Sequence, residues 1–148
     1  MSESPIMQSM REKFAAYQRV CTEAGPERAQ EALFAGYPER QRQMMGQFIN
    51  DNTLAEGFRR SVPLFAQMGM VMEVVDLSNQ GQDAVLEIQR VCPFLGLAQE
   101  YGVEKPCIVV CELDVKATQQ AFPGMKGRIL SRLADGECVC LFKYEREQ

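Results

Sequence analysis

The sequence of 148 residues contains no histidine and no tryptophan. Without an imidazole the protein has no Ser-His or Cys-His catalytic pair, and no histidine can hold a metal ion. Glycine-rich phosphate loops of the G-x-G-x-x-G and G-x-x-x-x-G-K-[ST] types, the G-x-S-x-G motif and the EF-hand loop are absent as well. Any chemistry therefore falls to thiols, carboxylates, lysine, tyrosine or backbone groups.

Long apolar runs and an excess of positive charge are also lacking. No run approaches the ~20 residues that cross a bilayer, and no basic segment leading into an apolar stretch indicates a signal peptide. The net charge of −4 and the pI near 5.0 argue against non-specific binding to nucleic acid or membranes. We therefore expect a cytoplasmic protein with reduced thiols and without nucleic-acid or membrane partners. The oligomeric state is left open.

The composition is that of an ordinary globular protein, with 46% hydrophobic and 24% charged residues. At this length we expect a single domain over residues 1–148, with a helical part over 1–68 and a cysteine-bearing α+β part over 69–148. The nine methionines have two interpretations. They are either adaptable core filling or the flexible wall of a pocket for an apolar ligand.

The first part is predicted to form four helices, because apolar residues recur at steps of three and four positions. In the first helix these residues are Ile6, Met10, Phe14, Tyr17 and Cys21. Pro26 and Pro38 fit the starts of the second and third helices. Thr53 with Glu56 resembles a capping box before the fourth. Cys21 is interpreted as a structural residue of the first helix.

The second part is predicted to contain two β-hairpins separated by two helices. The strands are expected over 70–77, 84–91, 128–134 and 138–145, and the helices over 93–101 and 105–121. In the second strand Leu86 and Ile88 lie on one face, with Glu87 and Gln89 on the other. We expect an α+β fold in which four strands form an antiparallel sheet with helices on one face.

Five of the six cysteines lie at or after position 92. Cys92 directly precedes a predicted helix, where backbone N–H groups and the helix dipole lower a thiol pKa. Alternatively it is a small residue at a tight junction. Cys107 and Cys111 are four residues apart and would share one helical face with Asp114. Alternatively they are buried hydrophobic residues.

Cys138 and Cys140 alternate along the last predicted strand and would share the face of Phe142 and Tyr144. If Cys92, Cys107, Cys111 and Cys140 converge, they form a thiolate site for zinc or an iron–sulfur cluster. The spacing of these four cysteines matches no zinc-finger or ferredoxin pattern. A site of three thiolates with Asp114 or Glu112 is a variant of the same hypothesis.

The order of short motifs in the second part resembles the L-2-amino-thiazoline-4-carboxylic acid hydrolase family. These motifs are Cys92-Pro93-Phe94, Cys107, Cys111-Glu112-Leu113-Asp114, and the closing run from Asp135 through Cys140 to Phe142. The resemblance implies hydrolytic opening of a cyclic, amidine-like thiazoline. It also implies a site formed by Cys92, Cys107, Cys111, Asp114 and Cys140. A weaker similarity, over the final third, is to the 4-vinyl reductase small-molecule-binding domain, whose sensor members hold a structural zinc through cysteines and a glutamate.

Three functions remain open from the sequence. The first is a small hydrolase in which Cys92 or water attacks the amidine carbon, Asp114 holds the amidine and Arg90 holds the substrate carboxylate. The second is a non-catalytic small-molecule-binding or sensing module whose cysteines hold zinc or an iron–sulfur cluster. The third is a structural or interaction protein with buried cysteines.

Overall fold

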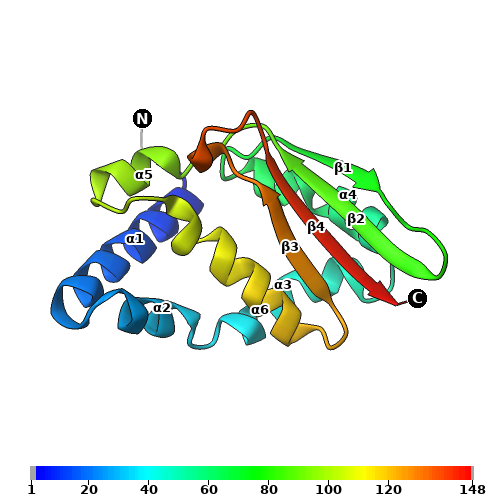
Figure 1. Ribbon diagram of the computed structural model, residues 1–148, viewed down its shortest axis with the longest axis horizontal. Helices are drawn as coiled ribbons and strands as arrows, with labels where there is room; N and C mark the ends of the chain where they lie inside the picture. The colour runs from blue at the N-terminus through cyan, green and yellow to red at the C-terminus, as the bar shows by residue number, and fades with distance from the viewer. Residues whose placement is uncertain (1–2, 148) are drawn as a thin grey trace.

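The computed structural model describes residues 3–147 of the chain. Four helices come first, then two β-hairpins that enclose two further helices (Figure 1). The elements are α1 (Pro5–Ala24), α2 (Pro26–Phe34), α3 (Tyr37–Ile49), α4 (Leu54–Ala66), β1 (Met72–Asp76), β2 (Gln82–Gln89), α5 (Leu95–Glu100), α6 (Cys111–Ala121), β3 (Lys126–Ser131) and β4 (Cys140–Glu147). None of the described helices combines the length and apolar character that crossing a membrane requires.

Local signals explain where the first helices begin. Pro5 and Pro26 occupy first-turn positions, where a missing N–H costs nothing. The Ser4 hydroxyl caps α1 by accepting a hydrogen bond from the Met7 N–H at 3.2 Å. The Thr53 hydroxyl caps α4 in the same way, accepting from the Glu56 N–H at 3.2 Å, as the capping motif predicted.

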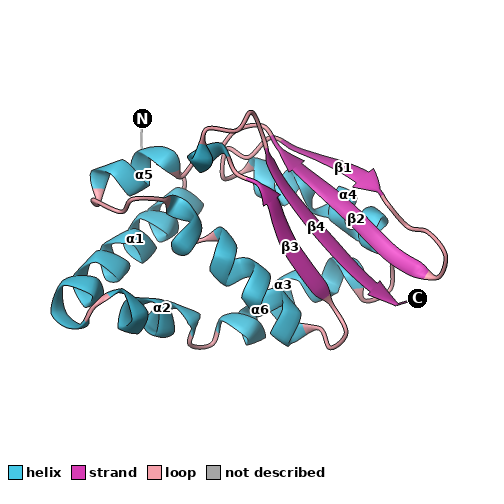
Figure 2. Cartoon of the chain, in the orientation of Figure 1, coloured by secondary structure: helices cyan, strands magenta, loops and turns pink. Residues whose placement is uncertain are grey.

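The four strands form one antiparallel sheet in the order β1-β2-β4-β3, so the two hairpins join through β2 and β4 (Figure 2). In β2, Val85 is buried opposite Tyr144, and Gln89 lies opposite Cys140. The face of Val85, Glu87 and Gln89 therefore turns towards the helices. The predicted α+β fold class and the four-stranded antiparallel sheet are confirmed.

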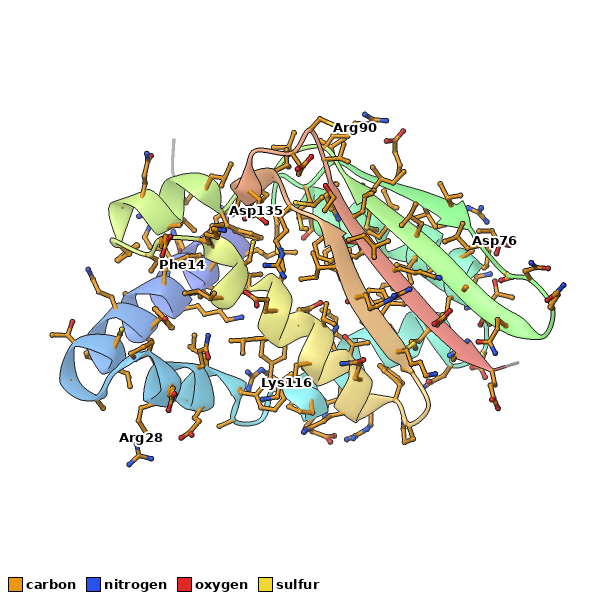
Figure 3. The ribbon with its side chains drawn as sticks, in the orientation of Figure 1. Phe14, Arg28, Asp76, Arg90, Lys116 and Asp135 are labelled. Atoms are coloured by element: carbon orange, nitrogen blue, oxygen red, sulfur yellow. The ribbon has the colours of Figure 1, made fainter. Side chains whose placement is uncertain are left out.

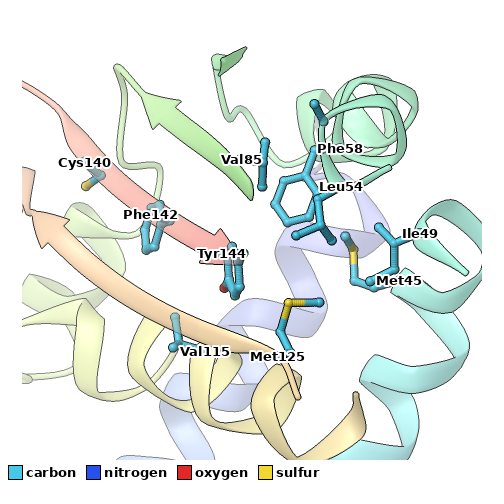
Figure 4. Close-up of a cluster of buried hydrophobic side chains, with 11 residues drawn as sticks. Met45, Ile49, Leu54, Phe58, Val85, Val115, Met125, Cys140, Phe142 and Tyr144 are labelled. Carbon is cyan, nitrogen blue, oxygen red and sulfur yellow. The ribbon is translucent and has the colours of Figure 1, made fainter. Parts of the chain in front are cut away.

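The buried side chains form two separate groups. One lies between the sheet and helices α3, α4 and α6, where Phe142 and Tyr144 of β4 face Val115 and Met125 (Figure 4). The other lies among α1, α2, α5 and the segment before α6, with Phe14, Phe94 and Val109 at its centre. The helices of this second group lie away from the sheet in Figure 1. Two adjacent cores leave room for a cavity between them.

Several predicted element boundaries are wrong in ways that affect the cysteines. The helix predicted over 105–121 begins only at Cys111, because a 3₁₀ turn over Pro106–Ile108 precedes it. Cys107 and Cys111 therefore do not share one α-helical face. The strand predicted over 138–145 begins at Cys140, so that Cys138 is exposed outside it. Cys140 is buried and does share the face of Phe142 and Tyr144.

The remaining differences are at the ends of elements. The strand predicted over 128–134 runs from Lys126 to Ser131, and a 3₁₀ turn over Leu133–Asp135 follows it. The helix predicted over 93–101 spans Leu95–Glu100, so Cys92 is not its N-cap. Tertiary pairing sets these ends, and periodicity alone does not locate them.

Candidate functional site

A cavity of about 750 Å³ lies between the two buried groups, and side chains from both parts of the chain line it. Its apolar wall is rich in methionine and phenylalanine and consists of Met10, Leu33, Met44, Phe65, Met68, Met70, Phe94, Val110 and Phe142. Its polar lining consists of Ser9, Glu12, Lys13, Tyr37, Arg40, Gln41, Glu87, Cys111, Asp114 and Tyr144. A cavity that combines an apolar wall with converging polar groups is a usual form of a small-molecule site.

Asp114 in the first turn of α6 is the best-connected polar group of the cavity. The Tyr37 hydroxyl donates a hydrogen bond to its Oδ1 at 3.1 Å, and the Lys13 ammonium donates to the Tyr37 hydroxyl at 3.4 Å. Burial raises the pKa of Asp114, while the hydrogen bond from Tyr37 and the charge of Lys13 oppose that rise. Side chains from three helices, α1, α3 and α6, thus form one hydrogen-bond network.

Lys13 and Arg40 bring positive charge to the same corner. The Lys13 Nζ lies 4.4 Å from the centre of the Tyr37 ring, and the Arg40 guanidinium carbon lies 5.3 Å from it. Burial lowers the pKa of Lys13 to about 8, although the charge of Asp114 opposes the shift. At neutral pH Lys13 is therefore mostly protonated and remains able to pair with an anion.

Glu87 on β2 is a second carboxylate in the cavity wall. Burial raises its pKa to about 7, against a hydrogen bond that the Gln89 side chain donates to its Oε2 at 3.0 Å. The charge of Asp114 raises it further. The Oε1 atom of Gln89 is buried, and no described residue donates a hydrogen bond to it. Two carboxylates with raised pKa values in one cavity are characteristic of acid–base sites.

The structure distributes the predicted cysteines unevenly. Cys111 lines the cavity beside Asp114, whereas Cys92, Cys107 and Cys140 are not among the residues that line it. Burial raises the pKa of all four thiols. The charges of the other three are smaller causes of the rise at Cys111, so the four sulfurs lie within electrostatic reach of one another.

Cys92 differs from the sequence-based expectation. The N–H groups of Phe94 and Leu95 do lower its pKa, but burial outweighs them and the net shift is upward. Cys140 is likewise engaged, because its sulfur accepts a hydrogen bond from the Leu133 N–H at 3.2 Å. These thiols are therefore protonated at neutral pH and are weak nucleophiles.

A resident metal ion gains no support from the described residues. Within residues 3–147 no group of three or more cysteine, aspartate or glutamate side chains is placed to hold one. The zinc or iron–sulfur site of Cys92, Cys107, Cys111 and Cys140 gains no support from the geometry and stays a prediction.

Arg90 lies outside the cavity. Its side chain is exposed and pairs with Glu73 of β1 at the edge of the sheet, where Figure 3 labels it. The sequence reasoning missed Lys13, Tyr37 and Glu87. The available signal was the polar side of β2, since Glu87 and Gln89 share the face of the buried Val85.

The family model for L-2-amino-thiazoline-4-carboxylic acid hydrolase matches residues 4–144. The chain belongs to this family. The match covers both parts of the chain and all cavity residues named above, and the resemblance inferred from the motifs is confirmed. Among curated proteins, none matches the chain closely enough to count as a relative.

A solved structure has a fold similar to that of this chain. It is the crystal structure of the phenol-responsive sensory domain of the transcription activator PoxR with phenol, with a TM-score of 0.59 and 14% sequence identity. The alignment covers 92% of this chain and 73% of that one. At this identity the likeness concerns the fold.

Proposed function

We propose that the protein is a small-molecule hydrolase that binds a compact cyclic amidine in the cavity, with Asp114 pairing to the amidine group. The observation that carries the proposal is the position of Asp114 in the cavity wall, with Oδ1 held by Tyr37. No hydrogen bond among the described residues engages Oδ2. A charge-assisted hydrogen bond from an amidinium fits this free oxygen.

The cations of the cavity suggest where a substrate carboxylate binds. Lys13 and Arg40 flank Tyr37 next to Asp114, whereas Arg90 is exposed and already paired with Glu73. We therefore assign carboxylate binding to Lys13 and Arg40 in place of Arg90. The apolar wall would exclude water from the rest of the ligand and strengthen both ionic contacts.

Water is the favoured nucleophile in this proposal. The Cys92 thiol has a raised pKa and does not line the cavity. Attack by Cys92 stays a prediction from the motif, and its substitution by serine is the direct test: unchanged turnover excludes it.

Substituting Asp114 tests the binding proposal. In Asp114→Asn the charge is lost while the shape is kept, and binding of 2-amino-thiazoline-4-carboxylate, measured by calorimetry, should weaken about 10- to 100-fold. The control is Asp135→Asn, which makes the same chemical change at an exposed aspartate that pairs with Lys105. Equal affinities of both variants would contradict the role of Asp114.

A second candidate function is non-catalytic sensing of a small molecule. The apolar cavity and the fold shared with a phenol-responsive sensory domain favour it. Under this alternative the protein binds cyclic amidines or aromatic ligands tightly and leaves them unchanged. Product analysis by mass spectrometry after prolonged incubation separates the two functions, and metal analysis of protein purified without oxygen tests the four-cysteine site.

A further inference from the structure

A second, much smaller hollow adjoins the cavity. Its volume of about 20 Å³ is enough for a single water molecule, which needs roughly 10–15 Å³ and two to four polar partners. It is lined by Gln41, Met45, Ile49, Phe58, Phe65, Glu87, Asp114, Thr118, Met125 and Tyr144. Both carboxylates and Tyr144 line both spaces, so anything held in the hollow faces the bound ligand.

The polar groups of the hollow differ in whether their hydrogen-bonding atoms are already engaged. The Thr118 hydroxyl accepts from the Gln41 amide at 2.9 Å and donates to the Asp114 carbonyl oxygen at 2.8 Å, so its proton is engaged. The Tyr144 side chain is only 4% exposed and lines the hollow, where a side-chain hydrogen bond with Thr118 lowers the pKa of its hydroxyl against the larger, opposite effect of burial. One buried donor and two carboxylate acceptors thus converge on a space the size of one water.

We propose that this hollow binds an ordered water molecule between Glu87, Asp114 and the Tyr144 hydroxyl, and that this water is the nucleophile of the hydrolase. The water accepts a hydrogen bond from Tyr144 and donates to the two carboxylates. The catalytic half of this inference rests on the proposed function, whereas the water site does not.

Glu87 is the general base of this arrangement. Asp114 is occupied by Tyr37, by the nearby charge of Lys13 and by the amidine. The groups around Glu87 are Gln89 on its own strand, Asp114 on α6, and Cys140 and Tyr144 on β4. None of these is a cation, so Glu87 can accept a proton. Its pKa of about 7 suits a base that works at neutral pH.

The reaction step balances with these groups alone. The water oxygen bonds to the amidinium carbon, one water proton passes to Glu87, and the C=N electron pair moves to nitrogen, which becomes neutral. In ring opening the C–S bond breaks with its electron pair on sulfur, and sulfur takes the proton from Glu87. The new hydroxyl becomes a carbonyl and releases its proton to solvent.

Water magnetic relaxation dispersion tests the site without any turnover. Wild type should show one more long-lived internal water than Thr118→Ile, whose extra carbon fills the hollow. Thr118→Val, which loses the hydroxyl but keeps the space, should retain that water. A crystal structure of the unliganded wild type should also show a water oxygen within hydrogen-bonding distance of Glu87, Asp114 and Tyr144. Equal water counts in all three proteins, or a hollow without water in the crystal, would overturn the site.

Glu87→Gln tests the catalytic role. Turnover should fall about 100-fold or more, while the dissociation constant for the substrate changes less than threefold. In wild type, kcat should rise with pH through about 7 and this limb should vanish in Glu87→Gln. The matched control is Glu104→Gln, at an exposed glutamate that does not line the cavity, and this variant should keep both constants. Loss of affinity in Glu87→Gln with an unchanged kcat would refute the role as base. If wild type binds the amidine without opening it, the hydrolase proposal fails, and the water count alone then decides the site.

Discussion

Asp114 and Glu87 carry the same chemical group, but their different neighbours suit them to different roles. Both carboxylates line the same cavity, and burial raises the pKa of each. Asp114 has a hydrogen bond from Tyr37 and the charge of Lys13 beside it, whereas Glu87 has only the amide of Gln89. The first is therefore equipped to hold a cation, and the second to exchange a proton.

The burial of Glu87 should make the stability of the protein depend on pH. An unfolded glutamate loses its proton near pH 4.5 and folded Glu87 near pH 7, so the folded chain holds more protons between these values. The free energy of unfolding therefore falls as the pH rises through this window. Glu87→Gln should gain about 2–3 kcal/mol over wild type at pH 8 and almost nothing at pH 4.5, measured by urea unfolding.

The sequence analysis named two of the polar residues that line the cavity. Cys111 and Asp114 were found because a motif carries them. Lys13 and Tyr37 were missed because helical periodicity shows which side of a helix is apolar, but not which distant helix packs beside it. Glu87 was placed on the polar side of its strand, and only the sheet pairing reveals that this side faces inwards.

At the scale of elements, the contact between α3 and α4 depends on Gly57. A Cβ atom there would lie 2.6 Å from the Phe48 carbonyl oxygen and 2.7 Å from a methyl carbon of Ile49. Both distances are shorter than real Cβ contacts, so only glycine, whose side chain is a hydrogen atom, fits at this position. The Phe48 oxygen belongs to the backbone and cannot move aside as a flexible side chain can. The close packing of α3 on α4 supports the wall formed by Met44 and Phe65.

Gly57→Ala should therefore destabilise the protein although alanine favours helices. We expect a loss of about 1–3 kcal/mol in the free energy of unfolding, because overpacking outweighs the helix-propensity gain of about 1 kcal/mol. At Gly96 in α5 an added Cβ atom would meet no heavy atom within 4 Å, so Gly96→Ala is the matched control and should be neutral or stabilising. Similar effects at both sites would contradict the steric argument.

Elements were predicted well where their signals are local. The signals of Pro26, Pro38 and Thr53 located the starts of α2, α3 and α4. The region from Cys92 to Cys111 was predicted less well, because two 3₁₀ or turn segments replace helical turns there. An apolar run such as Ile108-Val109-Val110 fits a helix and a buried turn equally.

At the scale of the whole molecule, an ion pair between the buried Asp83 and the partly buried Arg146 joins the helical part to the sheet. The Asp83 carboxylate of β2 accepts from the Leu54 N–H at 3.0 Å and from the Arg146 Nε at 2.9 Å. Arg146 also donates to the carbonyl oxygens of Ile49 and Asn52, at 2.9 and 2.7 Å. The end of α3, the start of α4 and two strands thus meet at one point.

Removing Arg146 should weaken this junction strongly. Arg146→Met leaves Asp83, which is 4% exposed, without its counter-ion, and we expect a loss of about 3 kcal/mol in urea unfolding. The control is Arg128→Met on β3, an exposed arginine that makes no ion pair within the described residues, with an expected change below about 0.5 kcal/mol. A small effect at Arg146 would show that packing alone holds the two parts together.

The methionines that line the cavity have a consequence for the protein's sensitivity to oxidation. Met10, Met44, Met68 and Met70 present four thioethers to the space in which a ligand would sit. Peroxide converts a thioether to a sulfoxide, which is polar and chiral, and reductases can reverse the change. Oxidation should therefore alter ligand recognition before it disrupts the fold, because these four methionines line the cavity and are only partly buried, whereas the core methionines Met45 and Met125 are buried.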